Sequence, residues 1–536
     1  MHIVCIGNGS TQRYPAEVVG AKAANLARMA ALGLPVPPAF VLPIKLCAAL
    51  ARDDHIAKQK LQDGLADGIA FLEDATGARL GDRRRPLLVS VRSGAARSMP
   101  GMLDTVLNVG CTLDAVHGLV RLTGDPRFAW DCRRRFLESY ATVVLGIDAD
   151  LLAKRLTALA AAEGVISEQV LDCDSLERLA NSYLQVIDDK GHAVAENPMQ
   201  QLETAALAVY RSWSGERAQA YRQLQHFDDL QGTAVTVQSM VFGNRSRTSA
   251  SGVAFSRDPS TGAHQPVIDV LFESQGEDVV SGTRTPDGEE AIARTLPLVA
   301  NELRDVLQRL EREFADVQDV EFTIDSGKLW LLQTRAAKRT PLAAARFAID
   351  FVREGLMGPA YALRRLKGLD VAALTHERLI DAPSAAASGT AASTGIGVGR
   401  AAFDSDSAAR LAANGEPVIL VRPDTSTADV AGFAVAAGIL TAAGGRTAHA
   451  ALVARQMGKP CVVGCAGLSV DAASRAASLA ATMLKEGDWL TIDGQTGAVY
   501  LGQVKVAVER PDAELAEIER WRNHSTRHEL LLERPV

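Results

Sequence analysis

Four polar side chains interrupt a segment that otherwise has the pattern of two apolar strands. Asp319-Val-Glu321 and Gln333-Thr-Arg335 lie on either side of the turn Asp325-Ser-Gly-Lys328, which is typical of a β-hairpin. Because side chains alternate along a strand, Asp319 and Glu321 share one face, and Gln333 and Arg335 also share one. Such groups are costly to bury unless a charged ligand binds them. The pattern predicts a site for Mg²⁺ and nucleotide phosphates, since Mg²⁺ prefers oxygen ligands; the alternative is a solvent-facing polar stripe.

Two cations occupy places where a chain can meet phosphate. Lys22 follows Gly20 at the expected start of a helix over 21–32, and Arg92 ends the strand-like segment 86–92. A helix N-terminus offers free N–H groups and a positive dipole, and nearby glycines let the backbone approach an anion. Both positions therefore predict contacts with phosphate. A lysine near a helix start can also be an ordinary surface charge.

His449 stands where a strand leaves through two glycines and a helix begins, in the segment Thr441-Ala-Ala-Gly-Gly-Arg-Thr-Ala-His449. Near a helix N-terminus the dipole disfavours imidazolium, so the ring stays a neutral nucleophile at pH 7. Free N–H groups there would stabilise a phosphoryl group that the histidine accepted. Taken alone, a helical histidine can equally be a surface or core residue.

Length and composition limit the class of protein. The chain has 536 residues, of which 47% are hydrophobic and only 5% aromatic, and alanine is abundant throughout. This favours a helix-rich α/β protein of three or four units over an all-β sandwich. The net charge of −7 gives no electrostatic reason to expect nucleic acid as a partner. Neither a Walker P-loop nor a dinucleotide-binding glycine motif is present, so a nucleotide site must be built in another way.

The cysteines and the apolar runs suggest where the protein works. The seven cysteines are scattered and include no C-x-x-C pair, so we expect thiols rather than a disulfide framework. Cys461 and Cys465 have no second Cys/His pair, which favours buried thiols over a zinc site. No apolar run reaches the roughly 18 residues of a membrane span, and the start lacks a secretory pattern. We expect a cytoplasmic protein without a membrane partner.

The hydrophobic pattern changes along the chain. Residues 1–110 alternate short strands with helices, 125–230 are mainly helical, and strands return from Thr233 until a second α/β unit closes near Arg335. An alanine-rich helix pair over 341–366 precedes 382–395, a small-residue stretch that we expect to be a linker without a core. Residues 396–501 again mix strands and helices, and a charged helix over 513–531 follows.

Taken together, these segments resemble pyruvate phosphate dikinase, in one order along about residues 15–530. The resemblance covers nearly the whole chain, and phosphoenolpyruvate synthase, a more distant relative, shares fewer of the motifs. It is carried by Gly20–Ala27, Gly33–Pro38, Leu88–Ala95, Ser98–Met102, Gln275–Val280, Gln318–Ile324, Leu332–Arg335 and Gly444–His449.

The resemblance implies an α/β (α+β mixed) architecture in which an ATP-grasp nucleotide-binding domain precedes a swivelling β/β/α phosphohistidine domain. The implied domains are 1–337 with a helical insert at about 112–230, a helical and flexible linker at 338–395, the phosphohistidine domain at 396–508 and a C-terminal helix at 509–536.

The same resemblance implies roles for individual residues. Lys22 and Arg92 would contact ATP phosphates, Asp319, Glu321 and Gln333 would serve Mg²⁺ and nucleotide, Arg335 would stabilise transferred charge, and His449 would carry the phosphoryl group. ATP and phosphate would be the substrates and AMP a product. Thr447 matches a threonine that regulatory kinases modify in plant members, and Ala448 replaces a serine found in many dikinases.

The phosphoryl acceptor is where the sequence departs from the family pattern. Family members continue into a barrel that binds pyruvate, which takes roughly 250 residues, whereas 35 residues follow Leu501. We expect the pyruvate site on a separate subunit, with the helix over 513–531 as a surface for that partner or for a homodimer. The alternatives are another small-molecule acceptor, such as an antibiotic or metabolite, and a non-catalytic nucleotide-binding protein.

Overall fold

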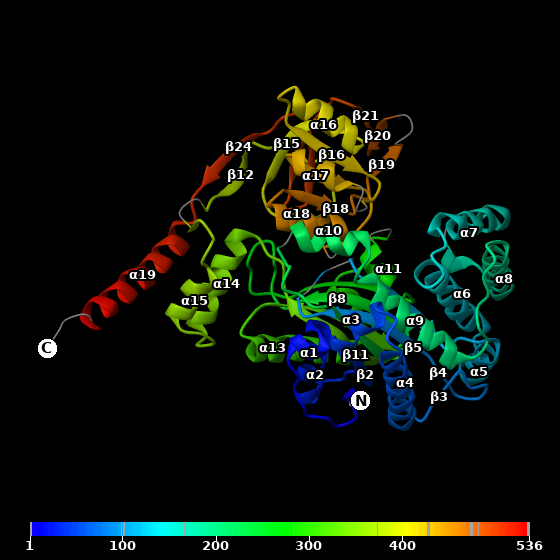
Figure 1. Cartoon of the computed structure of the whole chain (residues 1–536). Helices are drawn as coiled ribbons and strands as arrows, with labels where there is room; N and C mark the ends of the chain where they lie inside the picture. Colours follow the sequence, from blue (N-terminus) through cyan, green and yellow to red (C-terminus); the bar gives the residue numbers. More distant parts are fainter. Residues whose placement is uncertain are drawn as a thin grey trace. The chain divides into compact units, whose positions relative to one another are not determined.

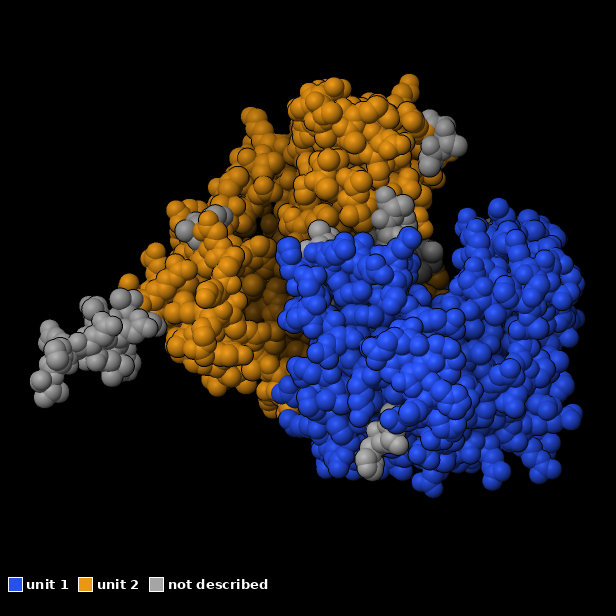
Figure 2. Space-filling model, viewed as in Figure 1, with its two compact units in different colours: residues 1–245, 330–334 blue, residues 246–329, 335–536 orange. Residues whose placement is uncertain are grey.

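The structure is a computed structural model, and it describes residues 3–97, 99, 102–165, 168–224, 226–281, 284–371, 374–425, 429–446, 448–471, 475–480 and 482–532. The chain divides into two compact units, coloured separately in Figure 2. Unit 1 comprises residues 1–245 and 330–334, and unit 2 comprises residues 246–329 and 335–536. Both mix helices with sheets, as the composition predicts.

Unit 1 is built on a five-stranded sheet in the order β1-β2-β7-β5-β6 (Figure 1). These strands are β1 (Val4–Ile6), β2 (Ala39–Leu42), β7 (Thr233–Ser239), β5 (Val89–Ala95) and β6 (Thr105–Val109). A short pair, β3 (Arg79–Leu80) and β4 (Pro86–Leu87), precedes β5. The predicted strand 86–92 is therefore present as β4 and β5.

Helices supply the rest of unit 1. They are α1 (Ala16–Val19), α2 (Ala21–Ala31), α3 (Lys45–Ala51), α4 (His55–Thr76), α5 (Leu113–Thr123), α6 (Pro126–Val143), α7 (Ala149–Glu163), the 3₁₀ turn η1 (Glu168–Val170), α8 (Cys173–Asp189), α9 (Pro198–Ser212) and α10 (Glu216–Leu224). Their ends follow from local sequence. Asp125 caps α6 by accepting from Phe128 N, and Pro126 takes the first helical position. Buried side chains of α4, α6, α8 and α9 pack with the sheet into one core.

A four-stranded antiparallel sheet has the order β11-β10-β8-β9, and it belongs to unit 2 except for residues 330–334 of β11, which are grouped with unit 1. Its strands are β8 (Ala250–Phe255), β9 (Val267–Phe272), β10 (Gln318–Asp325) and β11 (Lys328–Ala336), and its helices are α11 (Gly276–Ser281), α12 (Glu289–Thr295), α13 (Pro297–Phe314), α14 (Pro341–Arg353) and α15 (Pro359–Arg365). The turn between β10 and β11 has positive φ at Ser326 and Gly327. Two such residues match the tight turn of a twisted hairpin, so the predicted hairpin is confirmed.

An eight-stranded sheet forms the second half of unit 2, in the order β13-β23-β22-β15-β16-β17-β18-β14. Its strands are β13 (Ala387–Ser388), β14 (Thr390–Ser393), β15 (Ile396–Ala402), β16 (Val418–Arg422), β17 (Gly438–Thr441), β18 (Cys461–Val463), β22 (Trp489–Asp493) and β23 (Ala498–Leu501). β15 to β18 are parallel, and α16 (Ser405–Ala413), α17 (Val430–Val435) and α18 (His449–Met457) connect them. We call residues 387–501 the eight-stranded subdomain.

Smaller elements complete unit 2. A three-stranded sheet comprises β19 (Leu468–Asp471), β20 (Ala476–Leu479) and β21 (Thr482–Lys485), and a two-stranded ribbon joins β12 (His376–Ile380) to β24 (Lys505–Glu509). The C-terminal helix is α19 (Asp512–Leu532). Among the helices of the described residues, none combines the length and the apolarity that crossing a bilayer requires.

The prediction that 382–395 builds no core was wrong for its second half. Strands β13 and β14 belong to the eight-stranded sheet, and Ala392 and Ser393 are fully buried. Small residues allow this because the backbones approach closely. A Cβ added to Gly389 would lie 2.6 Å from the carbonyl oxygen of Val463. The small-residue composition therefore serves close packing here.

The start of α19 is covered by its own chain. Leu515, Ile518 and Trp521 are buried in a cluster with side chains of α14 and α15. We expected this helix to offer a surface to a partner or a homodimer. α14 and α15 already occupy the apolar face of its first three turns, and a partner or a homodimer at the rest of the helix stays a prediction.

Candidate functional site

The acidic pair predicted on the hairpin lies on one face of the four-stranded sheet. Asp319 is opposite Phe255 of β8, and Glu321 is opposite Val253. Directly opposite residues of an antiparallel ladder project to the same face, so Asp319 and Glu321 share a face as the strand period predicts. Asp319 is only 2% exposed and Glu321 is half-buried. The alternative of a solvent-facing stripe is therefore wrong for Asp319.

An ion pair between β10 and β11 lies at this face. Arg335 Nε donates to Asp319 Oδ2 at 2.8 Å. The second carboxylate oxygen, Oδ1, is buried and accepts no hydrogen bond from the described residues. Burial raises the pKa of the Asp319 carboxyl above its usual value, although the Arg335 cation opposes the shift. An unsatisfied buried acceptor beside a fixed cation is costly, and a cationic ligand would satisfy it.

Gln333 is buried on β11, and within the described part of the chain its Oε1 atom also accepts no hydrogen bond. Its segment, 330–334, is grouped with unit 1. There Asn25 Nδ2 of α2 donates to the carbonyl oxygen of Thr334 at 2.9 Å. This strand segment is thereby tied to α2, the helix that carries Lys22.

A contact between two glycines positions Lys22. Gly20 caps α2 with φ +82°, and a Cβ on it would lie 2.6 Å from the carbonyl carbon of Gly94 and nearer still to its oxygen. Gly94 is fixed in turn, because its N–H donates to Thr233 Oγ1 at 2.9 Å. Only glycine allows this approach. Lys22, at the second position of α2, is consequently held beside β5, and no acidic residue lies in the first turn of the helix.

Arg92 lies within β5, which is hydrogen-bonded on both sides. It is opposite Thr105 of β6 and Thr236 of β7, and its side chain is half-buried. The structure thus brings the two predicted phosphate contacts, Lys22 and Arg92, onto adjoining elements of unit 1. Asp319, Glu321 and Arg335 belong to unit 2.

His449 is the first residue of α18, as the strand–glycine–helix pattern predicts. The chain leaves β17, passes Gly444 with φ +106° and enters the helix after Ala448. Alanine has no side-chain acceptor, so Ala448 makes no side-chain cap, and the first turn holds no acidic residue. No negative charge in the first turn therefore offsets the positive end of the helix dipole. Thr447 lies outside the described residues.

Arg455 of α18 is a buried cation that the sequence did not single out as functional. Its side chain is 1% exposed and stacks over the Phe255 ring at 5.1 Å from the ring centre. Asp319 and Asp269 both attract it electrostatically. A helical arginine among buried alanines, here Ala451 and Ala454, is the only sequence signal that could have drawn attention to it.

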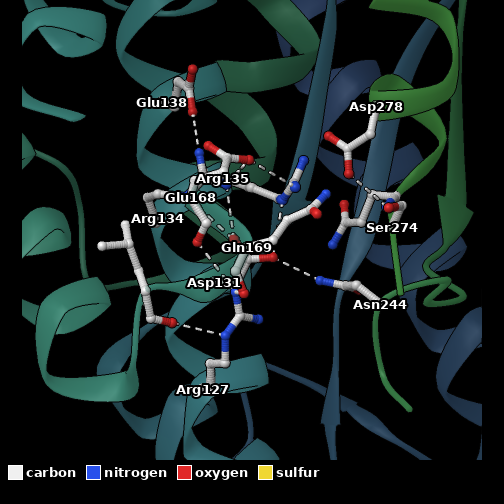
Figure 3. Close-up of polar contacts among 12 residues, drawn as sticks. Arg127, Asp131, Arg134, Arg135, Glu138, Glu168, Gln169, Asn244, Ser274 and Asp278 are labelled. Carbon is white, nitrogen blue, oxygen red and sulfur yellow. Dashed lines mark hydrogen bonds and ion pairs between the residues drawn. The ribbon is translucent and has the colours of Figure 1, made fainter. Parts of the chain in front are cut away.

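A second charged cluster, also not predicted, lies among the helices of unit 1 (Figure 3). Arg134 and Arg135 each bond a different oxygen of the buried Asp131, at 2.8 and 3.1 Å, and Asn244 Nδ2 donates to Asp131 Oδ2 at 2.7 Å. Burial opposes ionisation of Asp131, but the two arginines outweigh it and lower the pKa of the carboxyl. Glu168 accepts from both arginines. Paired in this way, the buried charges link α6 to the η1 segment.

The donor set of the hairpin fits Mg²⁺ and a nucleotide. Among the described residues no group of three or more His, Cys, Asp or Glu side chains could enclose a metal. Mg²⁺ usually takes only one or two carboxylates and completes its shell with water and substrate phosphates. Asp319 Oδ1 is a buried acceptor to which no described residue donates, and Glu321 adds a half-buried carboxylate, so this face of unit 2 offers oxygens of the kind that Mg²⁺ binds.

Family models match two parts of the chain. The model described as "Pyruvate phosphate dikinase, AMP/ATP-binding domain" matches residues 16–303 and 295–355. The model described as "PEP-utilising enzyme, mobile domain" matches residues 414–497. The first covers the predicted nucleotide contacts, and the second covers His449 and Arg455.

Curated relatives match nearly the whole chain. Pyruvate, phosphate dikinase 2 of Zea mays is 40% identical over 521 residues, which are 96% of this chain and 59% of the relative. Pyruvate, phosphate dikinase 2 of Oryza sativa subsp. japonica is 41% identical over 525 residues, 96% of this chain and 58% of the relative. The chloroplastic enzyme of Flaveria trinervia is 40% identical over 527 residues, 97% and 55% respectively. The chain spans somewhat more than half the length of these relatives, and it belongs to the pyruvate phosphate dikinase family.

Proposed function

We propose that this chain transfers a phosphoryl group from ATP to His449 in a Mg²⁺-dependent reaction that releases AMP. The bond from the β-phosphorus to the oxygen that bridges the α- and β-phosphates breaks, AMP leaves with that oxygen, and the β-phosphorus bonds to an imidazole nitrogen of His449, which gives up its proton. The bond from the γ-phosphorus to the oxygen that bridges the β- and γ-phosphates also breaks, and an oxygen of orthophosphate takes the γ-phosphoryl group to give pyrophosphate. We also propose domain boundaries at residues 337, 395 and 508. Dikinase-type relatives over 96% of the chain support this reaction class.

The observation that carries the proposal is the Asp319 carboxylate, which is buried with one oxygen bonded to Arg335 and the other without a partner among the described residues. Bound Mg²⁺ would neutralise charge on the phosphate oxygens. Asp319, Glu321 and Gln333 would hold the ion and orient the nucleotide. Arg335 would stabilise the charge that develops on the transferred group, and Lys22 and Arg92 would bind phosphate oxygens.

His449 would act as the carrier. Its backbone begins α18, where a positive dipole disfavours imidazolium and favours a neutral ring nitrogen that can attack phosphorus. The N–H groups of the first turn would then stabilise the phosphoryl group. A carrier histidine divides one difficult transfer into two easier ones.

Labelling tests the proposal directly. ATP labelled at the β-phosphorus, with Mg²⁺ and phosphate, should label the wild type with an acid-labile, base-stable group, and His449→Ala should stay unlabelled. His117→Ala is the matched control, because it alters a histidine of helix α5, outside the proposed site. Equal labelling of wild type and His449→Ala would reject the carrier. An AMP-forming reaction that needs no phosphate and yields no pyrophosphate would reject phosphate as the γ-acceptor.

The second half-reaction follows from the names of the relatives. They are pyruvate, phosphate dikinases, so we propose pyruvate as the acceptor of the group on His449. An acceptor site on a separate subunit, a homodimer and a cytoplasmic location stay predictions; several relatives are chloroplastic proteins. The location of the acceptor site can be tested by adding pyruvate to the labelled protein, with and without a candidate acceptor subunit. The decay of the label on His449 is then measured.

A further inference from the structure

Arg455 is a buried cation of the eight-stranded subdomain that the proposed reaction does not use, and no carboxylate of the described residues forms an ion pair with it. Its hydrogen bonds go to the backbone: Nε donates to the carbonyl oxygen of Ala451 at 3.2 Å, and Nη2 donates to that of Arg446. Nη1 is buried and has no acceptor in the described part of the chain. A buried charge of this kind is destabilising unless other charges compensate it.

The compensating charges come from the four-stranded sheet. Register places Asp319 opposite Phe255 on β8, while Asp269 of β9 and Glu321 of β10 both lie opposite Val253. Since Val253 and Phe255 are two residues apart, all three carboxylates share one face with the Phe255 ring. The Arg455 guanidinium lies over that ring; burial lowers the pKa of Arg455, and the Asp319 and Asp269 carboxylates oppose that shift. Its charge therefore faces the carboxylates of the candidate nucleotide site.

The loop before His449 meets the same face. A Cβ added to Gly445 would lie 2.6 Å from Asp269 Oδ2 and would collide with the Pro286 ring. Arg455 also holds this loop, by donating to the carbonyl oxygen of Arg446. A further contact, from Ser260 Oγ to the carbonyl oxygen of Ala392 at 2.9 Å, joins the segment after β8 to β14. In Figure 1, α18 lies on the side of its subdomain that faces β8.

We propose that Arg455 is a positioning residue that docks the eight-stranded subdomain on the carboxylate face of the nucleotide-binding sheet. Its cation is attracted to Asp319 and Asp269, its hydrogen bond to the Arg446 carbonyl oxygen holds residues 444–446, and the absence of a side chain at Gly445 lets the backbone approach Pro286 closely. The start of α18, with His449, is thereby held near the carboxylate face, where ATP would react. The effect of Arg455 on phosphoryl transfer rests on the proposed function, whereas the docking of the subdomain does not.

The proposal separates binding from transfer. Among the described residues Arg455 makes no hydrogen bond to Asp319, so Arg455→Gln should bind Mg·ATP with a Kd within threefold of the wild type. Phosphorylation of His449 at saturating ATP should slow on the order of 100-fold, the scale expected when a reacting group is misplaced by about 1 Å. Arg455→Lys keeps the charge and should recover at least part of that loss.

A second variant guards against simple misfolding of the arginine variants. Gly445→Ala leaves Arg455 intact and obstructs only the seat against Pro286 and Asp269, so it should slow phosphorylation to a similar extent. Gly467→Ala is the matched control, because a Cβ there would lie 3.4 Å from Ala387 Cβ, an ordinary van der Waals contact. It should phosphorylate at the wild-type rate.

Docking itself can be measured without ATP. Hydrogen exchange of the peptides that contain Ser260 and Ala392, which the Ser260–Ala392 hydrogen bond joins, would report the docked state. Arg455→Gln and Gly445→Ala should each raise the exchange rate of these peptides at least threefold, and Gly467→Ala should not. Unchanged exchange in both variants would overturn the positioning role, whatever the labelling shows. Faster exchange in a chain that ATP never labels would keep the positioning role and reject the proposed function.

Discussion

Replacing Gly20 with alanine tests whether the glycine contact in unit 1 positions the phosphate-binding lysine. Gly20 has φ +82° and ψ 153°, a conformation that is essentially restricted to glycine and costs another residue about 1–3 kcal/mol. The new Cβ would also lie 2.6 Å from the carbonyl carbon of Gly94, which adds about 1–3 kcal/mol of overpacking. We therefore expect Gly20→Ala to lower the free energy of unfolding of unit 1 by about 2–6 kcal/mol.

Gly33→Ala is the control for this variant. Gly33 follows the other end of α2 and has φ +71°, and no atom of the described residues lies within 4 Å of the place that its Cβ would take. Gly33→Ala should lower the free energy of unfolding only by the cost of a left-handed backbone conformation, about 1–2 kcal/mol. Urea unfolding gives both free energies, and hydrogen exchange of the α2 peptide assigns the transition to unit 1. If the two variants lose the same free energy of unfolding within about 0.5 kcal/mol, the close contact between Gly20 and Gly94 does not determine the stability of this region. Labelling of His449 should fall far more in Gly20→Ala than in Gly33→Ala, because only the former displaces Lys22.

Three further predictions concern single charges. Arg335→Ala should slow single-turnover labelling of His449 on the order of 100- to 1,000-fold, and a wild-type rate would remove Arg335 from the site. Mg·ATP affinity, measured by calorimetry, should fall as the pH drops through the raised pKa of Asp319, because the ion binds the ionised carboxylate; Asp319→Asn should abolish that dependence. Asp131→Asn should cost about 3–5 kcal/mol of stability at pH 7. Because the folded pKa of Asp131 is depressed, its contribution is present above the unfolded pKa near 4, so the difference in urea unfolding should shrink as the pH falls below it.

Local pattern predicted several strands and helices because their limits are set by local chemistry. The apolar run Val267–Phe272 is β9 over the same residues, since polar and turn-forming residues bound it. Within the predicted mainly helical stretch 125–230, α9 and α10 are separated at Ser214-Gly215, because a glycine favours a break over continuation. Residues 387–393 were missed as strands since their small side chains carry no strand signal. Their pairing depends on partners more than 70 residues away.

The candidate site was predictable to the extent that its residues share an element. Asp319, Glu321 and Arg335 lie on one hairpin, where strand period and turn residues fix which side chains meet. The charge pairing of Asp131 with Arg134 and Arg135 could have been found from i,i+3 and i,i+4 spacing on a helix. Arg455 could not, because the face it contacts belongs to β8, β9 and β10, about 130 to 200 residues earlier in the chain.

The buried carboxylates of Asp131 and Asp319 differ in how completely the protein satisfies them, and this difference distinguishes a structural group from a ligand-binding one. Both oxygens of Asp131 are bonded, to Arg134, Arg135 and Asn244, and the pKa of that carboxyl is lowered. Asp319 has one bonded oxygen and one to which no described residue donates, and burial raises its pKa. A site selected for stability alone would have no reason to leave a buried acceptor unsatisfied, since a second donor would stabilise the fold. An incompletely satisfied charge is what a ligand-binding site requires, because binding then supplies the missing interaction. A cation that binds at Asp319 would therefore supply an interaction that the fold of unit 2 lacks. The charges around Asp131 are already balanced within the fold.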